Sequence, residues 1–360
     1  MSAILHERLD KGQEALEVLT GLADEGDEPC REAFVELGDK LGFKGIVAVK
    51  LREWYSGAPA AKQQEAFRGA FDRFVEMGRD GDAAQMAVEL VQSKGATPEI
   101  VERLEEIAVR LRDLDALAVA HDTLAREKSG PDRAEEYVRQ AEVLVKAGVD
   151  PVEAAQQGEQ GLTSMPPDAV EPLLERLSAL LSAPGHVIDL YERQVGRCKS
   201  PADRLTALAR AAQVAAQRGA NDRAQSLFEL ALSGGVKEET LEVLERAAAD
   251  GDATAGGKAL RQILANSLAS GSSGLRDGGR TRSALLRRAA TLAWRELEDL
   301  DKAFEWLAQA LVTHVEPATL DALEELGDNA NALKRVEEVI GKALEEVFDG
   351  PLVRQLVARR

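Results

Sequence analysis

The sequence has few cysteine and aromatic residues, and it lacks long apolar runs. Aromatic side chains make up 4% of its 360 residues, and the two cysteines, Cys30 and Cys198, lie far apart and outside any CxxC motif. A disulfide framework is therefore excluded, although a single bond between the two cysteines stays open. No run of about 18 apolar residues is present, so we expect no membrane-spanning segment.

A surplus of positive charge is also missing. The formal net charge is −18, and phosphate contacts need an excess of Lys and Arg, so nucleic acid is not an expected partner. The charge also argues against binding to an anionic membrane by charge alone. It favours solubility, or long-range attraction of a basic partner. The N-terminal sequence MSAILHERLD has no basic start followed by an apolar core, so we expect no signal peptide and a cytoplasmic protein.

Strong helix formers are abundant. Alanine, leucine, glutamate and arginine dominate the composition, whereas alternating runs of β-branched residues, which mark strands, are missing. Apolar residues recur at three- and four-residue spacing in segments such as 202–218 and 223–232, which is typical of amphipathic helices. The sequence therefore predicts an all-α fold.

A short acidic or glycine-containing turn followed by an amphipathic helix recurs along the chain. Comparable positions in these copies are Ala84, Leu117, Ala154, Ile188, Ala224, Ala259 and Ala303. The intervals between them are 33, 37, 34, 36, 35 and 44 residues, so five of the six lie near 35. Two helices and two turns need about 34 residues, so the interval indicates a repeated helix–turn–helix unit.

Helix boundaries are marked in step with this repeat. Thr97-Pro98 and Ser200-Pro201 are typical helix starts, with an N-cap residue followed by proline in the first turn. Glycine is expected where helices end. Such glycines are Gly95, Gly148 and Gly219.

Two segments resemble tetratricopeptide repeats. The large, small and aromatic positions of that family fall on Leu208, Ala211, Ala212, Ala224, Phe228 and Ala231 in the first segment. In the second they fall on Ala290, Trp294, Ala303, Leu307 and Ala310. The resemblance covers roughly residues 60–313, although Gly158 and Gly161 match the pattern poorly. Val236 stands where the family usually has a proline, which leaves a related HEAT-like array open.

The resemblance implies a right-handed α-solenoid of antiparallel helical hairpins in a single elongated domain. We expect residues 59–314 to form the repeats, with a flexible Gly/Ser loop at 270–280 inside one hairpin. We expect residues 1–58 and 315–360 to form N-terminal and C-terminal capping helices, because such arrays must cover their terminal apolar faces.

Three further patterns give expectations about side chains. Glu135 with Arg139, and Glu142 with Lys146, stand four residues apart, so we expect ion pairs within one helix. Three phenylalanines form one helical stripe, which is expected to be core, with an exposed partner groove as the alternative. They are Phe67, Phe71 and Phe74.

The sequence contains no recognisable catalytic, cofactor or metal site. The four histidines have no HxxxH spacing, and His121 beside Asp122 is interpreted as a surface pair. The segment 252–259 lacks the glycine, the Ser or Thr and the preceding strand of a phosphate loop. A clustered His, Asp and Arg set that would indicate an enzyme is not visible, so no enzymatic activity is predicted.

The resemblance implies that the first helix of each hairpin lines a concave face. Polar residues expected on that face are Arg73, Arg139, Lys146, Gln213, Gln217, Arg288 and Arg295. They would suit an acidic peptide or a C-terminal carboxylate, while a basic protein could bind the acidic outer surface. The predicted function is a protein–protein interaction scaffold or adaptor. The alternative is a structural or regulatory subunit of a larger multiprotein assembly.

Overall fold

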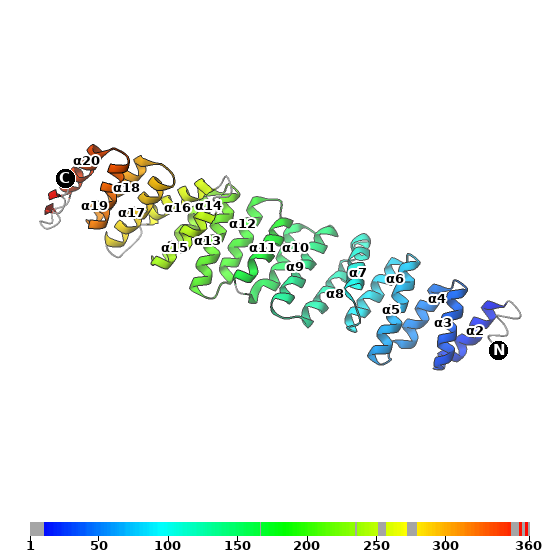
Figure 1. The fold of residues 1–360 in the computed structure, drawn as a ribbon. Helices are drawn as coiled ribbons and strands as arrows, with labels where there is room; N and C mark the ends of the chain where they lie inside the picture. Colours follow the sequence, from blue (N-terminus) through cyan, green and yellow to red (C-terminus); the bar gives the residue numbers. More distant parts are fainter. Residues whose placement is uncertain are drawn as a thin grey trace. The chain divides into compact units, whose positions relative to one another are not determined.

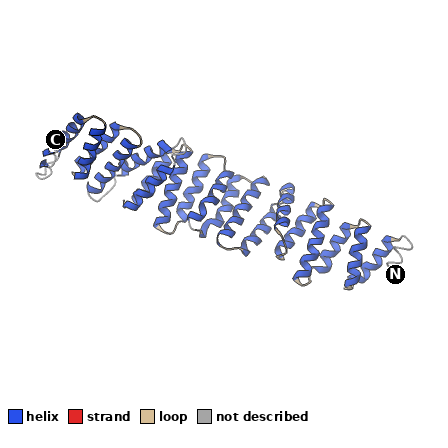
Figure 2. Cartoon of the chain, in the orientation of Figure 1, coloured by secondary structure: helices blue, strands red, loops and turns tan. Residues whose placement is uncertain are grey.

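The described part of the chain is entirely helical. The computed structural model describes residues 11–165, 167–234, 236–250, 257–271 and 279–346, together with 353–354 and 357–358. Within these residues there are nineteen α-helices, α2 to α20, one short 3-10 helix, η1, and no strand (Figure 2). The predicted all-α fold is confirmed.

The contacts between residues divide the chain into two compact units. The sequence, in contrast, predicts one elongated domain. The first unit is Met1–Met165 with Ala169–Leu181, and the second is Pro166–Asp168 with Ser182–Arg360. In a helical-repeat array each hairpin contacts only its neighbours, so contacts are local and the chain separates readily into such groups. Each unit is described by itself below.

The first unit begins with α2 and ends with the greater part of α11 (Figure 1). Its helices are α2 (Gly12–Asp24), α3 (Glu28–Lys40), α4 (Lys44–Tyr55), α5 (Ala60–Glu76), α6 (Asp80–Gln92), α7 (Pro98–Leu111), α8 (Leu114–Glu127), α9 (Gly130–Lys146), α10 (Pro151–Gly158), η1 (Glu159–Ser164) and α11 (Pro167–Leu180).

The second unit continues the same pattern of paired helices (Figure 1). Its helices are α12 (Pro184–Arg197), α13 (Pro201–Gln217), α14 (Asn221–Ser233), α15 (Glu238–Asp250), α16 (Gly257–Gly271), α17 (Gly279–Arg295), α18 (Leu300–Thr313), α19 (Pro317–Asn329) and α20 (Leu333–Glu346).

Helices pack within hairpins and also between corresponding helices of successive hairpins. In the first unit α8 packs on α7, its hairpin partner, on α9, the first helix of the next hairpin, and on α6, the second helix of the preceding hairpin. In the second unit α14 packs on α13 and α16 in the same way, and α18 packs on α17 and α20. This is the stacking of a tetratricopeptide-like α-solenoid.

The terminal segments contain hairpins of the same kind as the repeats. Helices α3 and α4 begin at residues 28 and 44, and the corresponding helices α5 and α6 begin at 60 and 80, which are 32 and 36 residues later. Helices α19 and α20 likewise follow α17 and α18. The hairpin pattern thus extends beyond residues 59–314 at both ends, and the capping roles of the terminal segments stay predictions.

The predicted helix starts are confirmed. Pro98 and Pro201 occupy the first turns of α7 and α13, and the Ser200 hydroxyl accepts a hydrogen bond of 3.0 Å from the backbone N–H of Asp203. This caps one of the N–H groups that a helix N-terminus leaves without a partner.

The predicted helix ends are marked by a left-handed residue, but this is not always the glycine. Gly148 and Gly219 have φ of +94° and +77°, as a helix-ending glycine requires. At the end of α6 the left-handed residue is Lys94, with φ of +59°. Gly95 is favoured for a different reason, because a side chain has little room there: a Cβ would lie 2.5 Å from Cγ of Gln64.

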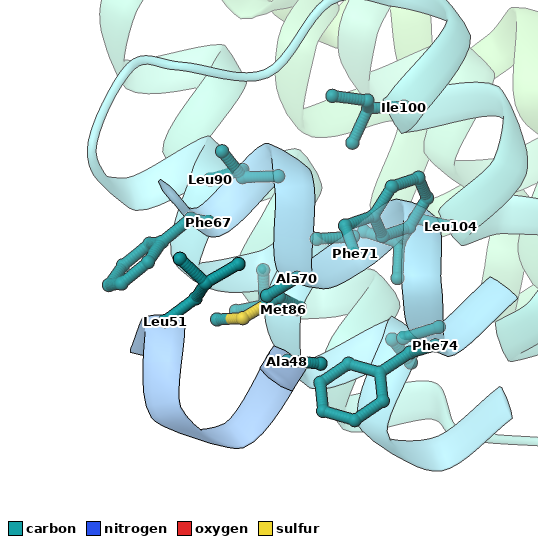
Figure 3. Close-up of a cluster of buried hydrophobic side chains, with 14 of the residues drawn as sticks. Ala48, Leu51, Phe67, Ala70, Phe71, Phe74, Met86, Leu90, Ile100 and Leu104 are labelled. Carbon is teal, nitrogen blue, oxygen red and sulfur yellow. The ribbon is translucent and has the colours of Figure 1, made fainter. Parts of the chain in front are cut away.

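The phenylalanine stripe of α5 is core, so the partner-groove alternative is wrong. Phe67, Phe71 and Phe74 are 4%, 5% and 3% exposed. They lie in a cluster of buried side chains that extends from α2 to α9, and Figure 3 shows part of it. Its other labelled members are Ala48 and Leu51 of α4, Ala70 of α5, Met86 and Leu90 of α6, and Ile100 and Leu104 of α7.

The residues that carry the family resemblance are core as well. All six in the first segment are at most 6% exposed, and Phe228 is completely buried. In the second segment Trp294 is only half-buried, and Trp306 of α18 is the buried tryptophan. The pattern is thus a packing pattern, because each position fills the space between two stacked hairpins.

The two glycines that match the family pattern poorly lie where helices approach closely. A Cβ on Gly161 would be 2.9 Å from Cα of Ala134, and one on Gly158 would be 2.6 Å from Cδ2 of Leu177. Helix α10 ends at Gly158, and the tighter 3-10 helix η1 follows it. Glycine is a poor helix former, which is consistent with this early end.

The predicted Gly/Ser loop is shorter than expected. Helix α16 continues through Gly271 and α17 begins at Gly279, so both ends of the 270–280 segment are helical. Residues 272–278 lie outside the described residues, as do residues 1–10 and 350–352.

Candidate functional site

The four arginines predicted for a binding face are each held by carboxylates of a neighbouring first helix. Arg73 of α5 donates from Nε to Asp39 of α3 at 2.9 Å, and Arg139 of α9 donates from Nε to Glu105 of α7 at 2.7 Å. In the second unit Arg288 of α17 binds Glu238 and Glu245 of α15, and Arg295 binds Glu325 of α19 at 2.7 Å. These guanidinium groups therefore join stacked hairpins.

The other three predicted residues do not extend this set into one site. Gln213 is 7% exposed, and its Oε1 accepts a hydrogen bond of 2.6 Å from Nη1 of Arg210. Lys146 and Gln217 are exposed on α9 and α13, near the C-terminal ends of these helices. The first-helix binding face therefore stays a prediction, and its arginines already have partners within the array.

Many of these ion pairs repeat at the same sequence interval. An acidic residue precedes its basic partner by 34 residues in pairs on first helices and on second helices. We call this set the 34-residue ladder. Its members are Glu28–Lys62, Asp39–Arg73, Glu105–Arg139, Glu142–Arg176, Asp189–Arg223 and Asp301–Arg335.

The ion pairs expected within α9 are wrong. Glu142 binds Arg176 of α11 at 2.7 Å rather than Lys146, and Glu135 also binds Arg176 rather than Arg139. Half-exposed pairs of this kind contribute about 1 kcal/mol or less each. Their effect is to set which faces of successive first helices meet.

His121 lies in a buried charged network and not in a surface pair with Asp122. The ring is 1% exposed. Its Nδ1 lies 2.7 Å from Oε1 of Glu136 on α9, and its Nε2 lies 3.5 Å from Oε1 of Glu105 on α7. Asp122, on the opposite side of the helix turn, pairs with Arg126. The partners of His121 thus come from the two neighbouring first helices.

Glu136 is held in its charged form by two donors. It is 4% exposed, and Nζ of Lys128 donates to its Oε2 at 2.5 Å. Burial would raise the pKa of Glu136, but the hydrogen bonds from His121 and Lys128 and their charges lower the pKa to about 2. An ionised carboxylate only accepts hydrogen bonds, so Nδ1 of His121 carries the proton.

This network is suited to holding helices together rather than to catalysis. A general base must reach the proton that it removes from a substrate, and the ring of His121 is enclosed by α7, α8 and α9. In the described residues no group of three or more His, Cys, Asp or Glu side chains has the geometry of a metal site. No helix among them is long and apolar enough to cross a bilayer.

An open groove lies at one end of the hairpins in the second unit. It is lined by the C-terminal ends of α12 and α14 and the N-terminal ends of α13 and α15, and its volume is about 710 Å³. We call it the α12–α15 groove. Its apolar lining includes Leu205 and Leu208 of α13 and Leu230 of α14. Leu230 is 46% exposed, although it is aliphatic.

Three basic side chains lie around the same groove. Lys199, Arg204 and Lys237 line it and are exposed, and no ion pair joins them to the residues that the structure describes. The one acidic side chain in the lining is Glu239. Sequence reasoning missed this site, because its members are spread over 42 residues and belong to no motif.

Cys198 also lines the groove, but its thiol is not activated. Burial, and then the charge of Asp203, raise the pKa of Cys198, so the thiol stays protonated at neutral pH and is a weak nucleophile. Both cysteines are free, which answers the question that the sequence left open.

No family model matches the sequence, and no curated protein matches it. Among solved structures the chain is similar to the Naa15/Naa10 complex bound to HypK-THB, with a TM-score of 0.32, 13% identity, and coverage of 99% of this chain and 59% of that chain. The chain thus spans about three-fifths of the length of that structure.

Two further structures are similar at comparable scores. Yeast Tom70 has a TM-score of 0.24 and 12% identity, with 99% of this chain and 93% of that chain covered. The C-terminal part of a TPR repeat-containing protein from Cytophaga hutchinsonii has a TM-score of 0.24 and 17% identity, with 71% and 99% covered. The second of these is named as a TPR repeat-containing protein.

Proposed function

We propose that the chain is a non-catalytic scaffold that binds a partner protein, and that the α12–α15 groove is one of its contact surfaces. The observation that carries this proposal is an exposed leucine, Leu230, at an open groove whose basic side chains have no ion pair in the described residues. Elsewhere in the second unit basic side chains such as Arg223 bind two carboxylates at once.

The groove has the composition of a binding surface. Protein contact sites combine an apolar centre with a polar rim, and here leucines of α13 and α14 form the centre while lysines and an arginine form the rim. The first-helix face around Lys146 and Gln217 is the second proposed contact surface. The expected cytoplasmic location stays a prediction.

A cross-linking experiment tests the scaffold proposal. A photoreactive amino acid replaces Leu230 in the full chain, which is expressed in the cells from which the sequence comes, and cross-linked proteins are identified by mass spectrometry. Leu111 of α7, which is 45% exposed, is replaced in the matched control. We expect a defined partner to be captured from position 230 and not from position 111.

Two outcomes would change the proposal. If neither position captures a partner above the level of an unirradiated sample, the groove is not a contact surface of a scaffold. If the chain elutes from size-exclusion chromatography only in a stable complex with several proteins at fixed ratio, the alternative of a structural subunit in a larger assembly is favoured.

A further inference from the structure

We infer that the α12–α15 groove binds a short acidic segment of a partner protein, with an aliphatic side chain of that segment inserted between α13 and α14. This inference rests on the proposed function and adds the chemical class of the occupant. The observation behind it is that cations without an ion pair in the described residues and an exposed aliphatic side chain line the same groove of an acidic chain.

The charges around the groove select a negative occupant. Lys199, Arg204 and Lys237 supply three positive charges, against one negative charge from Glu239. Asp203, next to Arg204 in sequence, adds a second negative charge that acts on Cys198 in the groove, so the local charge is three positive against two negative. The chain as a whole is acidic, with a net charge of −18, whereas the cations at the groove attract carboxylates locally.

The positive charges are also free to bind. Along the 34-residue ladder the arginine side chains already have carboxylate partners, so a peptide carboxylate would have to displace one of these. At the groove no carboxylate of the described residues pairs with the three cations, and a partner's carboxylate gains a new contact without breaking one.

The apolar part of the groove supplies the second half of the recognition. Leu208 is buried at the base, Leu205 is half-buried above it, and Leu230 is 46% exposed at the edge. An aliphatic side chain that covers Leu230 removes apolar surface of both partners from water, at about 25 cal/mol per Å² of buried area. The occupant therefore needs at least one Leu, Ile, Val or Met between its acidic residues.

The size of the groove favours a short segment. Its volume of about 710 Å³ lies within the range of about 300–1,000 Å³ that is usual for ligand sites. The groove is open to solvent and is formed by helix ends and turns rather than by a closed cavity. A few residues of extended or turn-forming peptide can occupy it, whereas a whole helix would reach beyond it.

Binding of defined peptides to the full chain tests this inference. The probe is a fluorescein-labelled peptide, acetyl-Asp-Glu-Leu-Leu-Asp-Glu-amide, and its binding is followed by fluorescence anisotropy. The controls replace both leucines with serine, or all four acidic residues with lysine. We expect each control to bind about tenfold more weakly or not at all, because it lacks one half of the recognition.

Two pairs of variants locate the binding site. Lys199→Glu with Lys237→Glu is expected to weaken peptide binding about tenfold, whereas the matched double variant Lys334→Glu with Lys342→Glu, at two exposed positions of α20, leaves it unchanged. Leu230→Ser is expected to weaken binding several-fold, and Leu111→Ser is the control of equal exposure. Hydrogen–deuterium exchange on the unmodified chain gives an independent readout, with slower exchange expected in residues 198–208 and 230–240 when peptide is added.

The outcomes separate this inference from the proposed function. Equal binding of the three peptides, or peptide-induced protection that maps outside residues 198–240, would overturn the acidic-segment inference even if position 230 cross-links to a partner. Preferred binding of the acidic leucine peptide in the groove, with no partner captured in cells, would support the chemistry of the groove and contradict the scaffold proposal.

Discussion

Nε of Arg139 lies 2.7 Å from Oε1 of Glu105, and the same carboxylate oxygen lies 3.5 Å from Nε2 of His121. Glu105 therefore belongs both to the 34-residue ladder and to the buried network that contains Glu136. Through this one carboxylate the half-exposed pair between α7 and α9 is continuous with the enclosed charges of α8 and α9. The first unit is thus joined at this point by charge as well as by apolar packing.

Replacing Glu136 with glutamine should destabilise the first unit. The pKa of Glu136 is lowered from 4.5 to about 2, which corresponds to about 3 kcal/mol of stabilisation at neutral pH. The measurement is the midpoint of urea unfolding of the full chain, followed by circular dichroism. The control is Glu135→Gln on the neighbouring position, where a half-exposed pair with Arg176 contributes about 1 kcal/mol or less. Equal shifts for the two variants would show that the network contributes nothing.

Acid should abolish the difference in unfolding midpoint between the unmodified chain and the Glu136→Gln variant. The folded pKa of about 2 lies below the unfolded value of 4.5, so the carboxylate stabilises fully above pH 4.5 and its contribution is lost as the pH falls through about 2. We expect the two unfolding midpoints to differ at pH 7 and at pH 5 by nearly the same amount, to approach each other below pH 4.5 and to coincide near pH 2. If the difference between the two midpoints grows as the pH falls, the pKa of Glu136 is raised on folding and not lowered.

Gly161→Ala should lower the free energy of unfolding, whereas Gly196→Ala should raise it. A Cβ at residue 161 would lie 2.9 Å from the backbone of Ala134, and this backbone cannot move aside without shifting α9. We therefore expect Gly161→Ala to lower the free energy of unfolding by about 1–3 kcal/mol. At Gly196 in α12 a Cβ meets no heavy atom of the described residues within 4 Å. Alanine there should stabilise by about 0.4–1 kcal/mol, because it restricts the unfolded chain. Thermal unfolding of the two variants checks the opposite signs.

Phe228 and Leu230 are close in sequence and should respond differently to truncation. Phe228 is completely buried and Leu230 is 46% exposed. Phe228→Ala should cost about 3–5 kcal/mol, and Leu230→Ala should change stability by no more than about 0.5 kcal/mol. Urea midpoints of the two variants give the comparison. A large loss for Leu230→Ala would mean that its side chain supports the fold and is not available to a partner.

The helical-hairpin fold could be predicted because its signals are local. Capping residues such as Ser200, the proline of α13 and the spacing of apolar residues act within a few positions of the chain, and the interval near 35 repeats them. The buried state of Phe71 followed from helical periodicity alone.

Side-chain partners could not be predicted in the same way. Glu142 lies four residues from Lys146 on one helix, yet it binds Arg176 of the next hairpin. The position of Arg176 depends on how α11 is placed beside α9, which the spacing of residues within α9 does not contain. The burial of His121 depends on Glu105 and Glu136, which come from two other helices. A search for acidic and basic residues 34 positions apart would have found the ladder from the sequence.

The α12–α15 groove was beyond such a search. Its cations and leucines come from α13, α14 and the turns that precede α13 and α15, so their meeting depends on how these helices stack. An exposed aliphatic residue such as Leu230 has the same helical spacing as its buried neighbours Leu227 and Ala231 on α14, so periodicity alone does not distinguish a groove from the core.

The enclosed carboxylate of Glu136 has a consequence for how the array assembles. Helices rich in alanine and leucine resemble one another, and during folding a helix can dock onto the wrong neighbour or one turn out of place. Glu136 tolerates only an arrangement that brings both a histidine ring and a lysine amine to it, since a charge left unpaired at that depth is strongly unfavourable. The network therefore favours the native docking of α8 and α9 over an arrangement that would leave Glu136 buried without its partners.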